Sequence, residues 1–298
     1  MTDRKYGKTT ADLGFMSVTP MPSRAELEKF YAETYFQTSA AMTYAPTYSP
    51  EELDQKRLRA RLVLHAITAT GRVTALNDAR LLEVGCGEGF ILQAATEAGC
   101  MTTGVDYSEH AIRSFHPDLL PNLRLGDAAT VLDNLRDSGE TFDVCVLQNV
   151  VEHVIDPFDL LAKVRAVMAK DGILLVNVPN DYSPMQTRLQ ELGWINREYW
   201  FSPPDHLHYF NVDNIGGVAD RAGFQVVDMF GDFPIELFLF HPGSNYVQDS
   251  GKGADAHRAR IILDLLLAER GLDAYHDFCR AMSRCGIGRN LCAVMAFK

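Results

Sequence analysis

The sequence predicts a doubly wound α/β fold built on a mostly parallel sheet of seven strands. Three observations support this prediction. Short β-branched runs recur from about residue 80 onward, helix-length segments separate them, and these segments end on glycine. Strands that alternate with helices indicate a parallel sheet covered on both faces, with right-handed crossovers.

The elements follow in order along the chain. The first five strands are expected at residues 81–84, 102–105, 123–125, 143–147 and 173–178. Helical segments such as FILQAATEAG and PFDLLAKVRAVMAKDG lie between them, and each closes on glycine. The alternation then stops, and it resumes with a helix capped by Asn211 and ended by Gly223. The sixth strand is FQVVDMF, and the apolar run LCAVMAFK supplies the seventh.

Three stretches fall outside this alternation and divide the chain. We expect an N-terminal helical lid at 1–70, a substrate cap at 181–211 and a second, mainly helical insertion at 231–290. The sheet domain then comprises 71–180 and 212–298. Without internal repeats or low-complexity linkers, these additions are expected to lie on the sheet domain as a cap.

Composition limits the classes of partner. With 28 Lys and Arg against 39 Asp and Glu, the net charge of −11 disfavours nucleic acid. Six cysteines lie mostly among apolar residues without CxxC pairs, which predicts reduced thiols and no cysteine zinc site. The N-terminus MTDRKYGKTT has no apolar core of a signal peptide, and the apolar runs are too short to span a bilayer. We therefore expect a cytoplasmic protein.

The segment LLEVGCGEGF, residues 81–90, places three glycines behind an apolar run. A Gly-rich turn from a strand into a helix lets backbone amides approach a ligand without an intervening Cβ. A dinucleotide fingerprint would need a third glycine where Phe90 stands. Glu88 would also repel a pyrophosphate, so a cationic ligand suits the loop better than a nicotinamide dinucleotide.

At these residues the chain resembles class I S-adenosylmethionine-dependent methyltransferases. The resemblance runs in order through LLEVGCGEGF, VDYSEHAI, LRLGDAA, FDVCVLQNVVEHVIDP and DGILLVNVPN. It covers roughly residues 78–230 and the last strand. It implies a Rossmann-like sheet with an antiparallel last strand, S-adenosyl-L-methionine as cofactor, S-adenosyl-L-homocysteine as product, and methyltransferase activity.

The resemblance also implies a cofactor site. Glu83 would lie near the ammonium group, Asp106 would take both ribose hydroxyls, and Asp127 would accept from the adenine amino group. The other implied contacts are Gly85, Cys86, Gly87, Gly89, Tyr107, Ala128 and Gln148. Each also has a structural interpretation, because glycines serve tight turns and aspartates cap helices.

Two segments could supply a catalytic group. In QNVVEHVIDP, Glu152 and His153 resemble part of the Glu-x-x-Glu-His arrangement that can hold a metal in ubiquinone-pathway O-methyltransferases. Here Asn149 replaces the first carboxylate, so we predict no metal. His153 has either a catalytic role or a hydrogen bond within the turn before Pro157.

The second segment is WFSPPDHLHYF. If it is extended, His206 and His208 point to the same face. Both are catalytic candidates. His206 is the preferred base, with a structural histidine as the alternative. Tyr44, Tyr48, Trp200 and Tyr209 are expected to contact the acceptor.

We expect O-methylation of a polar small molecule such as a sugar, a nucleotide sugar or a glycan end. Aromatic walls suit sugar rings and planar metabolites alike, so both kinds of acceptor stay open. N- or C-methylation of a small metabolite is the alternative within enzymes, and a catalytically silent cofactor-binding regulatory protein is the alternative outside them. The helical stretch Asp255 to Ser283 serves either as a homodimer face or as part of the cap.

Overall fold

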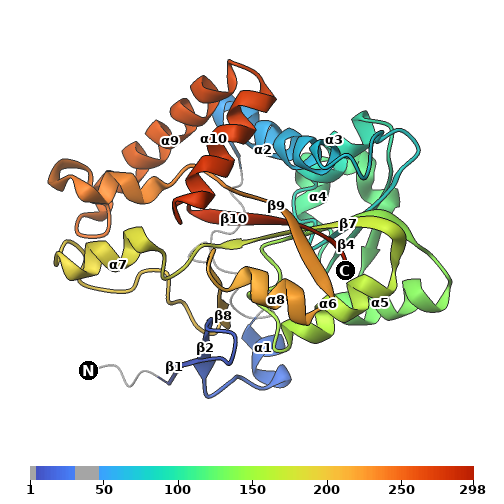
Figure 1. Ribbon diagram of the computed structural model, residues 1–298, viewed down its shortest axis with the longest axis horizontal. Coiled ribbons are helices and arrows are strands. Elements are labelled where there is room, and N and C mark those ends of the chain that lie inside the picture. Colours follow the sequence, from blue (N-terminus) through green and yellow to red (C-terminus); the bar gives the residue numbers. More distant parts are fainter. Residues whose placement is uncertain (1–4, 31–46) are drawn as a thin grey trace.

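The computed structural model describes residues 5–30 and 47–298. Its centre is a seven-stranded sheet in the order β5-β4-β3-β6-β7-β10-β9 (Figure 1). The strands are β3 (Arg80–Val84), β4 (Met101–Asp106), β5 (Leu123–Leu125), β6 (Phe142–Gln148), β7 (Met168–Pro179), β9 (Phe224–Gly231) and β10 (Asn290–Phe297). Strands β3 to β7 run parallel, whereas β10 is antiparallel to both β7 and β9. The predicted fold class and its antiparallel last strand are confirmed.

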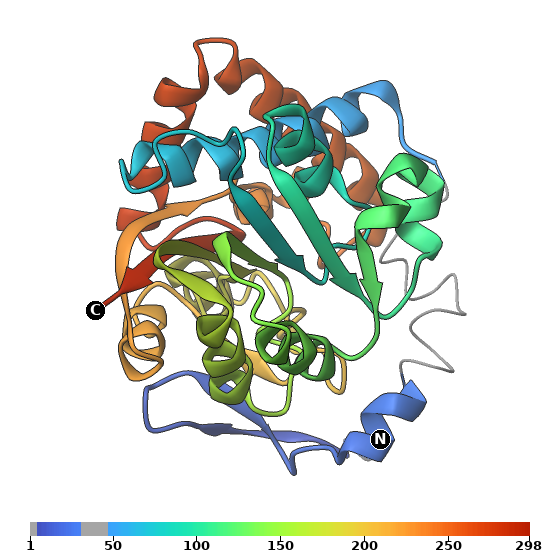
Figure 2. The same ribbon diagram turned by 90° about the vertical axis from the view of Figure 1, so that its right-hand side faces the viewer.

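Helices cover both faces of this sheet (Figure 2). One face carries α2 (Pro50–Ala69), α3 (Phe90–Glu97), α4 (His110–Phe115) and α10 (Leu272–Arg284). The other carries α5 (Ala128–Asp137), α6 (Pro157–Ala166) and α8 (Ile215–Arg221). Neighbouring strand residues such as Leu81 and Leu82 enter opposite core layers and are both fully buried. Burial on both faces explains why the strands are continuous apolar runs.

Two helix boundaries differ from the prediction. Helix α6 ends at Ala166, and β7 begins at Met168 rather than after Gly172. The carbonyl of Val167 accepts from the amide of Phe142, which joins this segment to β6 instead of prolonging the helix. Helix α8 begins after Asn214.

The N-terminal region is not a purely helical lid, and this prediction is wrong over residues 7–19. Strands β1 (Gly7–Thr10) and β2 (Met16–Thr19) form a hairpin, and β2 pairs with β8 (His208–Tyr209). Helix α1 (Arg24–Phe30) follows the hairpin. Residues 7–19 contain three threonines, which favour strands, but the second partner of β2 is β8, almost 200 positions away.

The hairpin and the insertions share a third apolar core. Its buried members are Val18, Leu27, Leu189, Ile195, Trp200, Leu207, Tyr209 and Leu239. They come from the N-terminal hairpin and α1, from the insertion with α7 (Pro184–Glu191), and from η3 (Ile235–Phe240). The insertion after β7 is therefore a packed layer beside the sheet domain.

The second insertion is mainly helical, as expected. It contains α9 (Gly253–Ala268), α10 and the short turns η3, η4 (Pro242–Ser244) and η5 (Ser250–Lys252). Another short turn, η2 (Pro117–Asn122), precedes β5 in the sheet domain. Among residues 5–30 and 47–298, no helix combines the length and the apolarity that a bilayer crossing requires.

Candidate active site

The glycine loop joins the carboxyl end of β3 to α3. Gly85, Gly87 and Gly89 have φ angles of +74°, +50° and +83°, which side chains rarely tolerate. A Cβ at Gly85 would lie 2.5 Å from Cγ2 of Val150, in the segment after β6. The loop therefore needs glycine for its backbone conformation and for its close contact with that segment.

Asp106, at the end of β4, stabilises the glycine loop through hydrogen bonds. Its Oδ2 accepts from the amide of Gly87 at 2.9 Å, and its Oδ1 accepts from the amide of Ser108 at 3.1 Å. Burial raises the pKa of Asp106. Each oxygen has a further lone pair, so the carboxylate retains capacity for hydroxyl donors. The neighbouring ring of Tyr107 is 62% exposed, as a group that flanks adenine would be.

Asp127 is the N-cap of α5. Its Oδ1 accepts from the amides of Ala129 and Thr130 at 2.9 and 3.4 Å, so the helix-cap interpretation is correct. Its Oδ2 accepts from Arg24 at 3.1 Å and from the hydroxyl of Tyr107 at 3.4 Å. A contact between Asp127 or the amide of Ala128 and adenine stays a prediction.

Glu83 and Cys86 differ in what they could offer a ligand. Glu83 is 3% exposed, and its Oε2 has no hydrogen-bond partner in the described part of the chain. Burial raises the pKa of Glu83 well above its usual value, so a cationic donor would stabilise its charged form. The thiol of Cys86 lies against Gly104 of β4 and has a packing role. Gln148 is half-buried at the end of β6.

Glu88 is already neutralised by α2 and the residues before it. Lys56 forms an ion pair with its Oε2 at 2.6 Å, and the hydroxyl of Tyr48 donates to its Oε1. The expectation that Glu88 selects a cationic ligand is therefore wrong, because Lys56 is the cation it meets. Tyr48 holds the glycine loop in this way. Tyr44, the other predicted acceptor contact near the N-terminus, lies outside the described residues.

An acid–histidine cluster, which we define as Glu152, His153, Asp205 and His206, lies after the carboxyl end of β6. Nδ1 of His153 is 2.7 Å from the carbonyl oxygen of Asp205, and the rings of His153 and His206 meet edge to face with centroids 4.7 Å apart. Ligating atoms of Glu152, His153 and His206 all lie within 4.8 Å of one another. The amides of Leu207 and His208 donate to the carbonyl of Glu152, which joins the two segments.

Burial sets the protonation of this cluster. Burial, aided by the charge of His153, lowers the pKa of His206 to about 3, so its imidazole is neutral at pH 7. Burial raises the pKa of Glu152 to about 7. For His153, burial opposes the charged form, but the hydrogen bond with Asp205 and the charge of Glu152 raise the pKa to about 9. Glu152 is the member that changes protonation near neutral pH.

The cluster has unused hydrogen-bonding capacity. Both carboxylate oxygens of Glu152 and Nδ1 of His206 are buried without a hydrogen-bond partner among the residues that the structure describes. A neutral imidazole with a free nitrogen can accept a proton. Two imidazoles and a carboxylate also fit a divalent transition metal. His206 offers the third donor that Asn149 does not, and the absence of a metal stays a prediction.

His208 is a structural histidine, and its predicted catalytic role is wrong. Its Nδ1 is 2.8 Å from Oγ of Ser17 in β2, and its ring meets Phe15 edge to face. Residues 203–205 form a turn and β8 begins only at His208, so His206 and His208 do not share one wall.

Trp200 and Tyr209 also do not line an open acceptor site. They are 2% and 1% exposed within the third core. The hydroxyl of Tyr209 donates to the carbonyl of His206 at 2.9 Å, so Tyr209 positions the base candidate. Asp205 was not identified from the sequence as a member of the acid–histidine cluster, although it directly precedes His206 in the chain.

The fold and the glycine loop define a class I methyltransferase architecture. A family model described as "Methyltransferase domain" matches residues 52–229, and the chain belongs to this family. The enzyme class and the cofactor class predicted from the sequence are those of the class I S-adenosylmethionine-dependent methyltransferases.

Curated relatives are ubiquinone biosynthesis O-methyltransferases. The Bradyrhizobium sp. protein is 26% identical over 212 residues, 67% of this chain and 82% of the relative. The Haemophilus ducreyi protein is 28% identical over 115 residues, which cover 37% of this chain, so the chain spans about half (49%) of that relative.

Solved structures show the same fold. A SAM-dependent methyltransferase from Archaeoglobus fulgidus aligns with a TM-score of 0.50 at 22% identity, over 84% of this chain and 95% of the other. The plantazolicin methyltransferase BamL aligns with a TM-score of 0.54 at 11% identity, over 91% and 94%.

Proposed function

We propose that the protein transfers the sulfonium methyl group of S-adenosylmethionine to a hydroxyl oxygen of a polar small molecule, such as a sugar, a nucleotide sugar or a glycan end. The observation that supports this proposal best is the acid–histidine cluster after β6, the strand beside the glycine-loop strand β3. The O-methyltransferase names of the curated relatives favour an oxygen acceptor.

The cofactor would occupy the carboxyl ends of β3 and β4. There the glycine loop offers its backbone, Glu83 meets the ammonium group, and Asp106 accepts from the ribose hydroxyls. Tyr107 and Asp127 would lie beside adenine. The cofactor supplies an activated methyl group, so the protein must align the acceptor and remove its proton.

In the proposed reaction the acceptor oxygen attacks the methyl carbon in line with the carbon–sulfur bond. The electron pair of that bond passes to sulfur, and S-adenosylhomocysteine leaves. Neutral His206 takes the hydroxyl proton at Nδ1 and passes it to Glu152, because an imidazole with a pKa of about 3 does not hold a proton at neutral pH. Glu152, whose pKa is raised to about 7 by burial, then holds the proton until it reaches solvent. His153 and Asp205 hold the two groups in place.

A divalent cation held by Glu152, His153 and His206 is a second candidate mechanism, because the donor atoms of all three residues converge. Such a cation would act as a Lewis acid and lower the pKa of the acceptor hydroxyl. His206 would then be a ligand instead of a base.

Calorimetric titration with S-adenosylhomocysteine, run beside NAD after a check for co-purified cofactor, tests the cofactor assignment. We expect micromolar binding of the first ligand and none of NAD. Release of S-adenosylhomocysteine in the presence of hydroxyl and amine acceptors then tests the reaction. Binding of NAD alone, or of neither ligand, contradicts the proposal, and turnover only with amines favours N-methylation.

Cofactor binding without turnover on any acceptor would favour the silent regulatory protein. A cytoplasmic location and a homodimer remain predictions from the sequence.

A further inference from the structure

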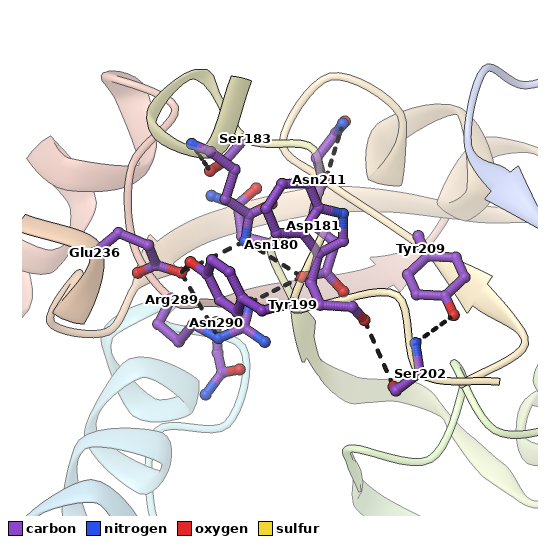
Figure 3. A network of polar contacts seen from close by, with 12 residues as sticks. Asn180, Asp181, Ser183, Tyr199, Ser202, Tyr209, Asn211, Glu236, Arg289 and Asn290 are labelled. Carbon is purple, nitrogen blue, oxygen red and sulfur yellow. Dashed lines mark hydrogen bonds and ion pairs between the residues drawn. The ribbon is translucent and has the colours of Figure 1, made fainter. Parts of the chain in front are cut away.

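A second polar network lies at the carboxyl edge of β7 and β9, where β10 begins (Figure 3). We call it the edge network and define it as Asp181, Gln186, Tyr199, Glu236 and Arg289. Asp181 follows β7, Glu236 lies in η3 after β9, and Arg289 immediately precedes β10. Gln186 comes from α7, and Tyr199 comes from the insertion after α7.

Arg289 and Gln186 join the two carboxylates. NH1 of Arg289 is 2.8 Å from Oδ1 of Asp181, and its Nε is 3.7 Å from Oε1 of Glu236. Nε2 of Gln186 lies 3.5 Å from Oδ1 of Asp181 and 3.4 Å from Oε1 of Glu236, so this amide stands between the two acids. Figure 3 shows Tyr199 with its hydroxyl directed at Glu236, a hydrogen bond of 3.2 Å.

The edge network lacks donors. Oδ2 of Asp181, Oε2 of Glu236 and Oε1 of Gln186 have no hydrogen-bond partner within the described ranges 5–30 and 47–298. All three side chains belong to residues that are at most 2% exposed. A buried acceptor left without a donor destabilises the folded state, because it has lost its hydrogen bonds to water. Three such atoms on one network indicate a group that the described part of the chain does not supply.

Within the part of the chain that the structure describes, the edge network also has more negative than positive charges. Two carboxylates face one guanidinium, which leaves a formal charge of −1 when both acids are ionised. Burial raises the pKa of both Asp181 and Glu236, although Arg289 opposes this shift. A second cation in contact with these acids would offset the cost of burying their charges.

The network reaches solvent beside aromatic rings. The side chain of Arg289 is 21% exposed, and Tyr199 and Tyr246 are half-buried with ring centroids 6.4 Å apart. Carboxylates combined with tyrosine rings are a chemistry that recognises an ammonium group.

The edge network is electrostatically coupled to the acid–histidine cluster. The charge of Asp181 acts on Glu152, and the charge of Arg289 acts on His206. Asp181 also donates its amide to the carbonyl of Phe210, four residues after His206, at 2.8 Å. A ligand group held by the edge network would thus lie on the same carboxyl edge of the sheet as the proposed base, because Asp181 follows β7 and the acid–histidine cluster follows the neighbouring strand β6.

We propose that the edge network is the acceptor-recognition subsite and that it binds a protonated amine of the acceptor. This inference rests on the proposed function and defines its substrate class: a molecule that carries both an ammonium group and the hydroxyl that is methylated, such as an amino sugar. A protonated amine has no lone pair for the methyl carbon, so it anchors the acceptor while the hydroxyl reacts.

The test compares D-glucosamine with D-glucose, which has a hydroxyl in place of the amine. Each sugar is titrated into protein saturated with S-adenosylhomocysteine, at a pH where the amine is protonated. We expect glucosamine to bind at least about tenfold more tightly than glucose. In Glu236→Gln and Gln186→Met this ratio should fall toward one, while the affinity for S-adenosylhomocysteine is unchanged.

Glu191→Gln is the matched control, because Glu191 is an exposed acid at the end of α7 that pairs with Arg188. It should keep the preference for glucosamine. Thermal melting of each variant shows whether it is folded. Because two variants of the edge network are measured, the prediction can still be tested if one of them does not fold.

Equal binding of the two sugars, no binding of either, or an unchanged ratio in folded Glu236→Gln would overturn the inference. None of these results affects the proposed methyl transfer, which fails instead if the wild-type protein does not bind S-adenosylhomocysteine.

Discussion

The two halves of the sheet's carboxyl edge satisfy their polar groups in different ways. At β3, β4 and β5, backbone amides meet the carboxylates of Asp106 and Asp127. At β6, β7 and β9, Glu152, Asp181 and Glu236 keep oxygens without hydrogen-bond partners in the described residues. The carboxylates of the first half are satisfied largely by backbone amides, whereas we propose that those of the second half receive groups of a ligand.

Glu83 is the exception on the first half, because its Oε2 also has no hydrogen-bond partner within the described residues. This is the position at which the cofactor's ammonium group is proposed to bind. Within the described chain, unpartnered acids therefore stand at each place where we propose that a ligand group or a proton is received: Glu83 for the cofactor's ammonium group, Glu152 for the proton, and Asp181 with Glu236 for the amine of the acceptor.

The largest effect should follow from His206→Ala. Removal of a positioned base should lower turnover by about 100-fold or more, because general base catalysis contributes about 10²–10⁴-fold. Affinity for S-adenosylhomocysteine should stay unchanged, since His206 belongs to the acceptor half. Steady-state kinetics and calorimetry measure the two quantities, and the exposed His241→Ala serves as control. Normal turnover in folded His206→Ala would assign the base to another group.

Gly85→Ala should act on the cofactor half instead. Its φ of +74° and the 2.5 Å contact with Val150 both oppose a Cβ, so we expect cofactor affinity to fall by about 10- to 100-fold. Gly139→Ala has nearly the same φ, +73°, but no atom within 4 Å of the added Cβ among the described residues. This variant therefore shows the effect of placing a side chain at a positive φ without a steric clash. Equal cofactor affinity in both variants would show that the contact is unimportant.

Asp106→Asn tests whether this acid contacts the cofactor as well as the loop. The amide would present an N–H group to Gly87 or Ser108 and would remove the charge that ribose hydroxyls meet. We expect cofactor binding to weaken by about 1.5–3 kcal/mol. The exposed Asp137→Asn is the control, and calorimetry is the measurement. Unchanged affinity would remove Asp106 from the site.

Glu152→Gln should change the pH dependence. Glu152 has a pKa raised to about 7 and works as a proton acceptor only when ionised, so wild-type turnover should rise with pH through about 7. The variant should lose this rise. The stability of the folded protein should change with pH in the opposite direction to turnover. Glutamate has a usual pKa of 4.5, and Glu152 has a pKa of about 7 in the folded state. Between these two pH values the folded state therefore holds a proton that the unfolded state has lost. The free energy of unfolding should therefore fall as pH increases across this window, and less so in the variant. Rate profiles and thermal melts at pH 5 and 8 measure both, and identical profiles would contradict the assignment.

The smallest effect is expected from a chelator. If His206 acts as a base, turnover after extensive dialysis against EDTA should match that of untreated enzyme. A loss of activity that is restored by added Zn²⁺ or Mn²⁺ would assign Glu152, His153 and His206 to a metal instead.

The acceptor half also shows where a local pattern misleads. His208, Trp200 and Tyr209 have residue types that suit a binding wall, and an extended segment would place His208 beside His206. The N-terminal hairpin covers His208 through Ser17 and Phe15, and the third core buries Trp200 and Tyr209. Which face of a segment is covered depends on a partner distant in sequence, so periodicity alone does not reveal it.

The sequence by itself determined the sheet, its helices and the cofactor loop. These features depend on spacing within short stretches: apolar strands of fixed period, and three glycines whose backbone conformation excludes side chains. Only the tertiary structure decided which polar groups belong together in the acceptor half. Glu152 meets His206, and Arg289 meets both Asp181 and Glu236, across more than 50 residues in each case, because parallel strands bring their carboxyl ends to one edge while their connections run elsewhere.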